Sequence, residues 1–425
     1  MKSASCLLSL CLLSAAAQAE TWIRCGHAVD VEQGTLTGAV TLVVADDRIQ
    51  RIIDGHPGAG ETTVIELGGL TCLPGLMDMH THLTTESSPT KYADRFTKNE
   101  ADVALQSVEY AGKTLRAGFT TVRDLGDSFN ASIALREAVN NGIIDGPRIY
   151  TSGKSLATTG GHADPTNGWR ADLMGSPGPN DGVLNGVAEA REAVRQRYKD
   201  GADLIKITVT GGVLSVAKSG MAPQFRPDEV QAVIETANDY NMHVAAHAHG
   251  AEGIKRAIEA GIHSIEHGTM MDDEVIGLMI KNGTWYIPTI SAGKFVAEKA
   301  KIDGYYPELV RPKAASIGPQ LQNTFARAHA AGVRIAFGTD CGVCYHGDNA
   351  HEFGYMVEAG MAPAEAIRTA TVYAAELLGV SVDAGTLSAG RWADVIAVEG
   401  NPLEDVGILT DVRFVMKAGQ VYKSL

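Results

Sequence analysis

Residues 73–83 have the sequence LPGLMDMHTHL, an apolar run that ends in His80 and His82. Side chains alternate between the two faces of a strand, so these two imidazoles are expected to lie on the same side. Both could then bind one metal ion through a ring nitrogen. Two histidines near a strand end are often only structural, so a metal site needs further ligands later in the chain.

The chain after residue 73 alternates short apolar runs with amphipathic stretches. The amphipathic stretches include residues 102–117, 187–200, 227–240 and 251–260, and they predict helices. Eight strand–helix units in succession predict an α/β fold, a TIM-like (β/α)₈ barrel over residues 73–383. The predicted barrel strands lie near residues 73–82, 120–125, 148–152, 204–209, 243–247, 264–267, 285–289 and 334–340.

Both ends of the chain lie outside this pattern and contain short strand-like runs separated by turns. Residues 20–72 include Thr41–Val44 before a turn, and residues 384–425 include Asp394–Val398. We expect the two ends to pair into one small β-sandwich domain beside the barrel. Residues 158–186 are rich in Gly, Pro, Asn and Asp, which predicts a long functional loop after the third barrel strand.

The first 19 residues have the features of a secretory signal peptide. Lys2 supplies a positive start, Leu7–Leu13 an apolar centre, and the sequence AQA at residues 17–19 a cleavage site. The alternative is a membrane anchor, but the apolar stretch is too short to span a bilayer comfortably. We therefore expect a mature chain that begins at Glu20, a periplasmic or secreted location, and no membrane contact after cleavage.

Four cysteines follow the predicted cleavage site: Cys25, Cys72, Cys341 and Cys344. An oxidising compartment would permit disulfides, and Cys25 could pair with Cys72, and Cys341 with Cys344. A zinc ribbon would need a second pair of closely spaced cysteines. Free buried thiols are the remaining alternative for all four.

Composition and charge exclude one class of partner. The chain has 425 residues, 45% of them hydrophobic, and a formal net charge of -14. This length is sufficient for a large barrel and a smaller second domain. The negative charge argues against a nucleic-acid partner, because such a partner favours a basic face.

Six candidate metal ligands are predicted at the carboxyl ends of the barrel strands, which converge on one mouth of a barrel. Imidazole and carboxylate suit a divalent ion such as zinc. A lysine cannot bind a metal as an ammonium ion, but it can once its amine has reacted with carbon dioxide to give a carbamate. A charged lysine in the apolar run 204–207 is also costly unless it is paired or modified. The six residues are His80, His82, Lys206, His247, His267 and Asp340.

These ligands belong to longer motifs that cover nearly the whole predicted mature chain. Besides residues 73–83, the motifs are GFTTVRDLG at 118–126, HAHG at 247–250, IEHG at 265–268, FGTD at 337–340 and LSAGRWADVIAVEGNP at 387–402. Together they resemble the amidohydrolase superfamily. Within it, the chain is similar to the imidazolonepropionase-related branch of secreted Xaa-Pro dipeptidases and carboxypeptidases.

The resemblance implies a centre of two divalent metal ions, with zinc as the expected element. One ion would be held by His80, His82 and Asp340, and the other by His247 and His267. Carboxylated Lys206 would bridge the two ions. An imidazolonepropionase proper would use one metal and lack the bridging lysine, so Lys206 argues against that assignment.

The resemblance also implies the reaction. Metal-activated water would attack an amide carbonyl, and Asp340 would accept its proton and pass it to the leaving amine. The expected enzyme cleaves the amide before a C-terminal hydrophobic residue or proline, in a short peptide or small molecule that has a free carboxylate. Ochratoxin A, an amide of phenylalanine that would give ochratoxin alpha and phenylalanine, fits this class. A homo-oligomer is expected, with the octamer of related dipeptidases as one form.

Two alternatives to this function remain open. The same metal centre could serve a hydrolase of cyclic amides or lactones. Some superfamily members have lost their metals, which would make the protein a binding module or scaffold. All six ligand positions are filled in this chain, and this favours an enzyme.

Three residues are predicted to contact the substrate. His162 follows the third strand and could touch the substrate and act in catalysis, or only order its loop. His249 comes two residues after His247 and could line the pocket or support a ligand. Related dipeptidases place a tyrosine near Phe225, so Arg226 or a histidine is expected to anchor the carboxylate instead. Four further polar residues are expected to be structural: Asp78, Arg123, Asp124 and His263.

Overall fold

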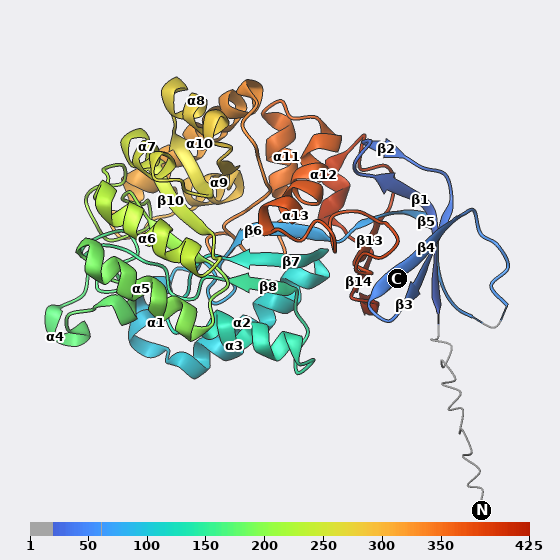
Figure 1. Cartoon of the computed structure of the whole chain (residues 1–425), viewed down its shortest axis with the longest axis horizontal. Helices are drawn as coiled ribbons and strands as arrows, with labels where there is room; N and C mark the ends of the chain where they lie inside the picture. Colours follow the sequence, from blue (N-terminus) through green and yellow to red (C-terminus); the bar gives the residue numbers. More distant parts are fainter. Residues whose placement is uncertain (1–19, 61) are drawn as a thin grey trace, which may run out of the picture.

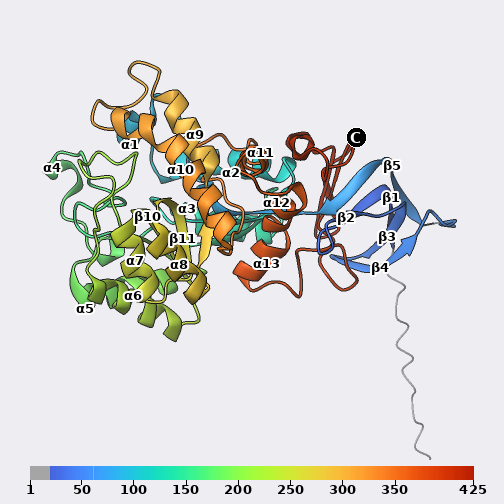
Figure 2. The same cartoon turned by 90° about the horizontal axis from the view of Figure 1, so that it is seen from above.

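The computed structural model describes residues 20–60 and 62–425. The predicted signal peptide, residues 1–19, lies outside the described residues. Figure 1 shows a β-sheet that carries the C-terminus beside a larger α/β body, in which helices surround shorter strands. Figure 2 gives the same arrangement from above, with the sheet at one end of the molecule. Within the described residues, no helix has both the length and the apolar character needed to cross a membrane.

Both chain ends contribute to one eight-stranded sheet. Strand β5 is the meeting point, because it pairs in parallel with β1 and antiparallel with β13. The sequence predicts a small β-sandwich from both ends, and the structure joins them in one sheet. Seven strands follow a single hydrogen-bonded path, and β2 lies off it, paired with β1. The strands are β1 (Thr21–Asp30), β2 (Thr35–Leu36), β3 (Val40–Ala45), β4 (Arg48–Asp54), β5 (Thr63–Pro74), β13 (Val395–Val398), β14 (Phe414–Lys417) and β15 (Gln420–Lys423).

Disulfides account for all four cysteines in the described residues. Cys25 and Cys72 join β1 to β5, with their Cα atoms 5.9 Å apart, and lie in the apolar core of the terminal sheet. Cys341 and Cys344 form the second bond, in the loop directly after Asp340. Of the alternatives left open by the sequence, the structure therefore has both disulfides and no free thiol among these residues.

The α/β body contains two parallel sheets, in which each strand lies beside the next one along the chain. The first sheet has the order β6-β7-β8, and the second runs through β9, β10, β11 and β12. Parallel neighbours of this kind require crossover connections, and helices supply them here. The strands are β6 (Leu76–Thr81), β7 (Phe119–Asp124), β8 (Arg148–Thr151), β9 (Ile205–Thr208), β10 (Val244–Gly250), β11 (Ser264–Met270) and β12 (Trp285–Ile287).

Helices pack around the strands of the body (Figure 1). Helix α2 begins with a capping box, because the Asn99 side chain accepts hydrogen bonds from Ala101 and Asp102, and Asp102 accepts one from Asn99 in return. The helices are α1 (Lys91–Thr97), α2 (Glu100–Arg116), α3 (Ala131–Asn140), α4 (Ala171–Met174), α5 (Gly186–Asp200), α6 (Pro227–Asp239), α7 (Ala251–Glu259), α8 (Asp273–Asn282), α9 (Ile290–Lys299), α10 (Arg311–Ala331), α11 (His351–Glu358), α12 (Pro363–Thr369) and α13 (Val372–Leu378).

Single parallel bridges connect the two sheets of the body. Residues 334–341 occupy the place between β12 and β6 that is predicted for the eighth barrel strand, but they do not form a regular strand. The segment meets β12 at Ile335 and the end of β6 at Cys341, each through a single bridge, and Asp340 near its end has a φ of 61°. The described residues thus form a mixed α/β fold, without one closed eight-stranded sheet. The bridges are Leu156 to Ile207, Tyr286 to Ile335 and Thr81 to Cys341.

Candidate metal centre

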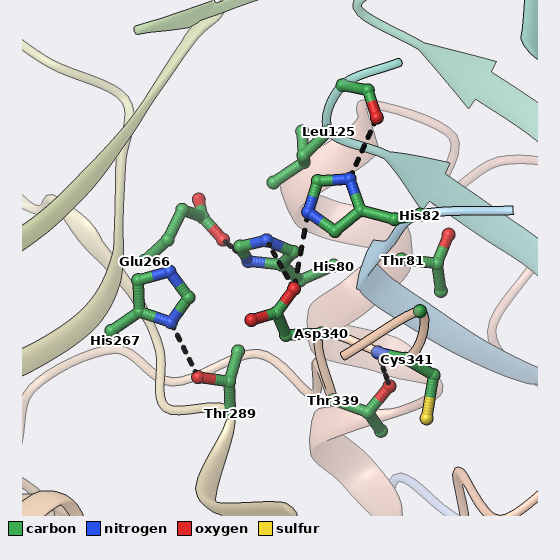
Figure 3. Close-up of polar contacts among 12 residues, drawn as sticks. His80, Thr81, His82, Leu125, Glu266, His267, Thr289, Thr339, Asp340 and Cys341 are labelled. Atoms are coloured by element: carbon green, nitrogen blue, oxygen red, sulfur yellow. Dashed lines mark hydrogen bonds and ion pairs between the residues drawn. The ribbon is translucent and has the colours of Figure 1, made fainter. Parts of the chain in front are cut away.

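His80 and His82 lie at the carboxyl end of β6, and both side chains turn toward Asp340 (Figure 3). Nε2 of His80 lies 3.5 Å from Oδ1 of Asp340, and Nε2 of His82 lies 3.2 Å from the same oxygen. His80 is only 1% exposed. The two imidazoles share one side of the strand end, as the alternation of strand side chains requires.

The second nitrogen of each imidazole is already occupied. Nδ1 of His80 is 2.9 Å from Oε2 of Glu266, and Nδ1 of His82 is 2.8 Å from the carbonyl oxygen of Gly126. Both partners are acceptors, so each Nδ1 donates, and each Nε2 of a neutral ring presents a lone pair. These lone pairs face Oδ1 of Asp340, which is buried without a hydrogen-bond partner. Three electron-pair donors directed at one another fit a cation between them.

The charge states of this group follow from burial and from its neighbours. Burial lowers the pKa of His80 to about 4. Burial also opposes protonation of His82, but Asp340 outweighs it and raises the pKa of that imidazole. Burial opposes ionisation of Asp340 as well, but attraction to His80 and His82 holds its pKa below the usual range. Asp340 is therefore ionised at neutral pH and available as an anionic ligand.

Two further imidazoles approach from β10 and β11. His267 forms a group with His80 and Asp340 in which the ligand atoms all lie within 4.8 Å of one another. His247 is beside it, with the two ring centroids 4.7 Å apart. Burial holds the pKa of His247 and of His267 well below the usual value, so both rings are neutral, and the neutral ring is the metal-binding form.

Lys206 lies on β9, where it pairs in register with Ala245 of β10. Its side chain is 3% exposed, and Nζ has no hydrogen bond or ion pair among the described residues. Burial lowers the pKa of this amine to about 8, so a larger fraction is uncharged at neutral pH than for an exposed lysine. An uncharged amine is the form that reacts with carbon dioxide. The site therefore combines an unpaired buried amine with candidate metal ligands.

Glu266, to which the sequence gives no role, lies behind His80 (Figure 3). It is fully buried and accepts hydrogen bonds from Arg123 at 2.8 Å and from the Ser264 hydroxyl at 2.6 Å. Burial would raise its pKa, but Arg123 and His80 lower it to about 2. A carboxylate on the far nitrogen of a ligating histidine fixes the ring and strengthens Nε2 as a donor. In the sequence, the one sign of a role for Glu266 is its position directly before His267 in the motif IEHG.

Asp78 links β6 to the segment that carries Asp340. Its Oδ1 accepts hydrogen bonds from the backbone N–H groups of His80 and Thr339, both at 3.1 Å. Its Oδ2 accepts from the Thr339 hydroxyl at 2.6 Å and from the Asn349 amide at 2.7 Å. These bonds fix the distance between the two ligand-bearing segments, which is a structural role.

Two of the three predicted substrate contacts lie beside the ligands. The His162 ring stacks on His247, with centroids 4.2 Å apart, and its Nδ1 is buried without a hydrogen-bond partner. The His249 ring lies 4.6 Å from the His247 ring, and Nδ1 of His249 is 2.7 Å from the Thr269 hydroxyl. His162 therefore has a free nitrogen beside the centre, whereas His249 is already engaged by a hydroxyl.

Arg226, the third predicted contact, is exposed at the start of α6. Its backbone N–H donates to the Glu229 carboxylate at 2.8 Å, and its side chain contacts none of the six ligands in the described part of the chain. Phe225 is buried in the apolar core. The sequence position suggested proximity to the substrate, but the turn into Pro227 carries Arg226 to the surface.

Two lysines that the sequence does not single out lie near the centre. Lys313 on α10 donates to the carbonyl oxygens of Gly212, Ser215 and Ala217, at 3.0, 2.9 and 2.9 Å. It therefore closes the loop that follows β9. Lys91, the first residue of α1, has its Nζ 3.5 Å from the carbonyl oxygen of Gly342.

Comparison with known proteins agrees with this geometry. The profile of the amidohydrolase family matches residues 71–423. Ochratoxinase of Aspergillus niger is 35% identical over 369 residues, which cover 83% of this chain and 75% of that protein. A crystal structure of a Xaa-Pro dipeptidase with methionine bound in its active site has a TM-score of 0.92 and 51% identity, and covers 95% of this chain and 100% of that one.

A crystal structure of a prolidase complexed with N-methylphosphonate-L-proline is also similar. Its TM-score is 0.87 at 31% identity, and it covers 96% of this chain and 100% of that one. The family profile spans well over half of the chain, including every candidate ligand. The chain therefore belongs to the amidohydrolase family, and it is a hydrolase.

Proposed function

We propose that this protein is a binuclear metal-dependent amidohydrolase that cleaves the amide before a C-terminal hydrophobic amino acid or proline. The observation that carries the proposal is the group of donors around Oδ1 of Asp340, which fits a cation between His80 and His82. The similarity to an ochratoxinase and to prolidases favours amides of amino acids. Ochratoxin A is one candidate, with ochratoxin alpha and phenylalanine as its products.

We propose that the donor set divides into two halves, with Lys206 between them. One ion would be held by His80, His82 and Asp340, and the other by His247 and His267. Lys206 would bridge them as a carbamate, formed when Nζ bonds to the carbon of carbon dioxide and a proton leaves. Zinc is the proposed element, since the nitrogen and oxygen donors suit it. Bound divalent ions supply Lewis-acid chemistry, which activates water and polarises the amide carbonyl.

The protein's own groups would move the proton and place the substrate. Asp340 would accept the proton of the attacking water and deliver it to the leaving amine, acting as base and then as acid. His162, whose ring stacks on His247, would donate to or accept from the substrate amide. His249 would line the pocket, with its ring fixed by Thr269.

Amidation of the substrate carboxylate is expected to reduce kcat/KM, because selection of a C-terminal amino acid requires recognition of its charge. The expected loss is on the order of 1–3 kcal/mol of transition-state binding, the scale of a charge-assisted hydrogen bond. The measurement compares N-acyl phenylalanines with their amides. Equal cleavage of acid and amide would overturn the exopeptidase function, and a broader amidase or a hydrolase of cyclic amides or lactones would take its place.

Export is proposed from the leader sequence. Mass spectrometry of protein from its native host should show a chain that begins at or near Glu20, because AQA at residues 17–19 fits a signal-peptidase site. The expected location is the periplasm or the medium. Recovery of a chain that still begins at Met1 would contradict export by cleavage.

Two further proposals concern organisation. The terminal β-rich domain would comprise residues 20–72 and 384–425, and the hydrolase barrel residues 73–383; the pairing of β13 with β5 supports the joining of both ends. The protein is also proposed to be a homo-oligomer, with an octamer as one form, on the resemblance to dipeptidases of this branch.

A further inference from the structure

A cation near the candidate ligands that is not already neutralised would bind a substrate carboxylate more strongly than a neutral donor. Arg226 is exposed and has no contact with the ligands in the described chain. Lys313 is saturated, because three carbonyl oxygens within 3.0 Å use all three donors of its ammonium group. Lys206 is itself one of the candidate ligands. None of these three offers a free positive charge to a substrate.

Lys91 differs from them in its hydrogen bonding. Within the described residues, its Nζ has one hydrogen-bond contact, with the carbonyl oxygen of Gly342 at 3.5 Å. That distance lies beyond the usual 2.7–3.2 Å or so of an N–H···O bond, so the contact is weak. Burial lowers the pKa of Lys91 to about 8, although Asp340 is close enough to oppose the shift. Lys91 is thus a partly buried cation without a close hydrogen-bond partner.

Lys91 contacts the loop after Asp340, and this loop packs on His82 at the end of β6. Gly342 comes two residues after Asp340 and has a φ of 111°. It packs so closely on His82 that an added Cβ would lie 2.7 Å from the His82 Cβ. The carbonyl group that Lys91 approaches therefore belongs to a residue in direct contact with a ligand.

Helix α1 is held over this region from two sides. The Tyr92 hydroxyl donates to the carbonyl oxygen of Leu214 at 2.8 Å, in the loop after β9. On the other side Lys91 contacts Gly342 in the loop after Asp340. The helix thus connects the loops that follow two segments with candidate ligands, and its first residue contacts the loop after Asp340.

We propose that Lys91 binds the free carboxylate of the substrate and so determines the preference for a C-terminal amino acid. This inference rests on the proposed function, and it assigns the anchor that the exposed Arg226 does not provide. An ammonium ion beside a carboxylate forms a charge-assisted hydrogen bond, which a water-excluded site strengthens. The weak contact with Gly342 would be exchanged for that stronger one.

The test compares N-benzoyl-phenylalanine with its C-terminal amide as substrates of the wild type, Lys91→Met and Lys91→Gln. The ratio of kcat/KM for acid over amide should fall about tenfold or more in both variants, mainly through KM of the acid. Hydrolysis of the amide should be almost unchanged. Lys91→Arg should retain most of the preference. A lysine that only tied α1 to the loop would alter acid and amide equally.

A binding readout accompanies the kinetics. Inhibition by the product L-phenylalanine should weaken about tenfold in Lys91→Met, whereas inhibition by phenylalaninamide should not change. The matched control is Arg95→Gln, which removes a positive charge one turn further along α1 and should leave the ratio as it is. Metal content and thermal unfolding show whether each variant is folded. If Lys91→Met does not fold, Lys91→Gln takes its place in this measurement.

The outcomes separate this inference from the proposed function. A wild-type enzyme that prefers the acid, with variants that keep the preference, overturns the role of Lys91 and leaves the exopeptidase function standing. An equal fall of the acid-over-amide ratio in Arg95→Gln also overturns the role of Lys91. A wild type without any preference for the acid overturns both the exopeptidase function and the anchor.

Discussion

Replacement of Asp340 by Asn is expected to lower kcat by several orders of magnitude and to leave the fold intact. The carboxylate is the group proposed to take a proton from water and return it to the amine, and an amide can do neither. General acid–base catalysis contributes on the order of 10²–10⁴-fold per step, and this variant removes both steps. Asn tolerates the left-handed φ of 61° at this position about as well as Asp.

The measurement is single-turnover and steady-state hydrolysis, together with circular dichroism and metal content. Asp348→Asn is the matched control, since it makes the same change at an exposed carboxylate of the same loop and should have normal kcat. A near-normal kcat in Asp340→Asn would assign the proton transfer to another group, for which His162 is the first candidate because its Nδ1 has no hydrogen-bond partner.

The sequence predicts those parts of the site that depend on local periodicity. The position of His80 and His82 on one side of β6 follows from strand alternation alone. The parallel order of strands follows from the repeated strand–helix units, because successive units lie beside one another. The pairing of β13 with β5 agrees with the expectation that the strand-like runs of both chain ends pair with each other.

Contacts between distant segments are the parts that the sequence does not predict. Arg123 and His80 form hydrogen bonds with Glu266 although they are 143 and 186 positions away in the sequence, and no local pattern predicts these contacts. The segment predicted as the eighth strand is the clearest structural difference, because it meets its two neighbours only through single bridges at Ile335 and Cys341. The sequence does not indicate a role for Lys91 for the same reason, because the residue that it contacts, Gly342, lies 251 positions further along the chain.

Replacement of Lys206 by Ala is expected to remove the bound metal ions together with nearly all activity. Lys206 stands on β9 beside β10, which carries His247, so its side chain faces the site from the strand next to a ligand. As a carbamate it would give both halves of the donor set a shared anionic ligand, which neutral imidazoles alone do not supply. Metal analysis of the wild type should find about two divalent ions per chain, and the variant should retain far less.

The modification itself is open to a direct test. Isotopically labelled bicarbonate should give a carbamate signal by nuclear magnetic resonance in the wild type and none in Lys206→Ala. Short carboxylic acids such as acetate should restore part of the metal and part of the activity, because they can occupy the vacated space and offer two oxygens. Lys218→Ala, an exposed lysine in the loop after the same strand, is the matched control and should behave as wild type. Full activity with full metal content in Lys206→Ala would show that no bridge at this position is needed, and the centre would then have to be held by the histidines and Asp340 alone.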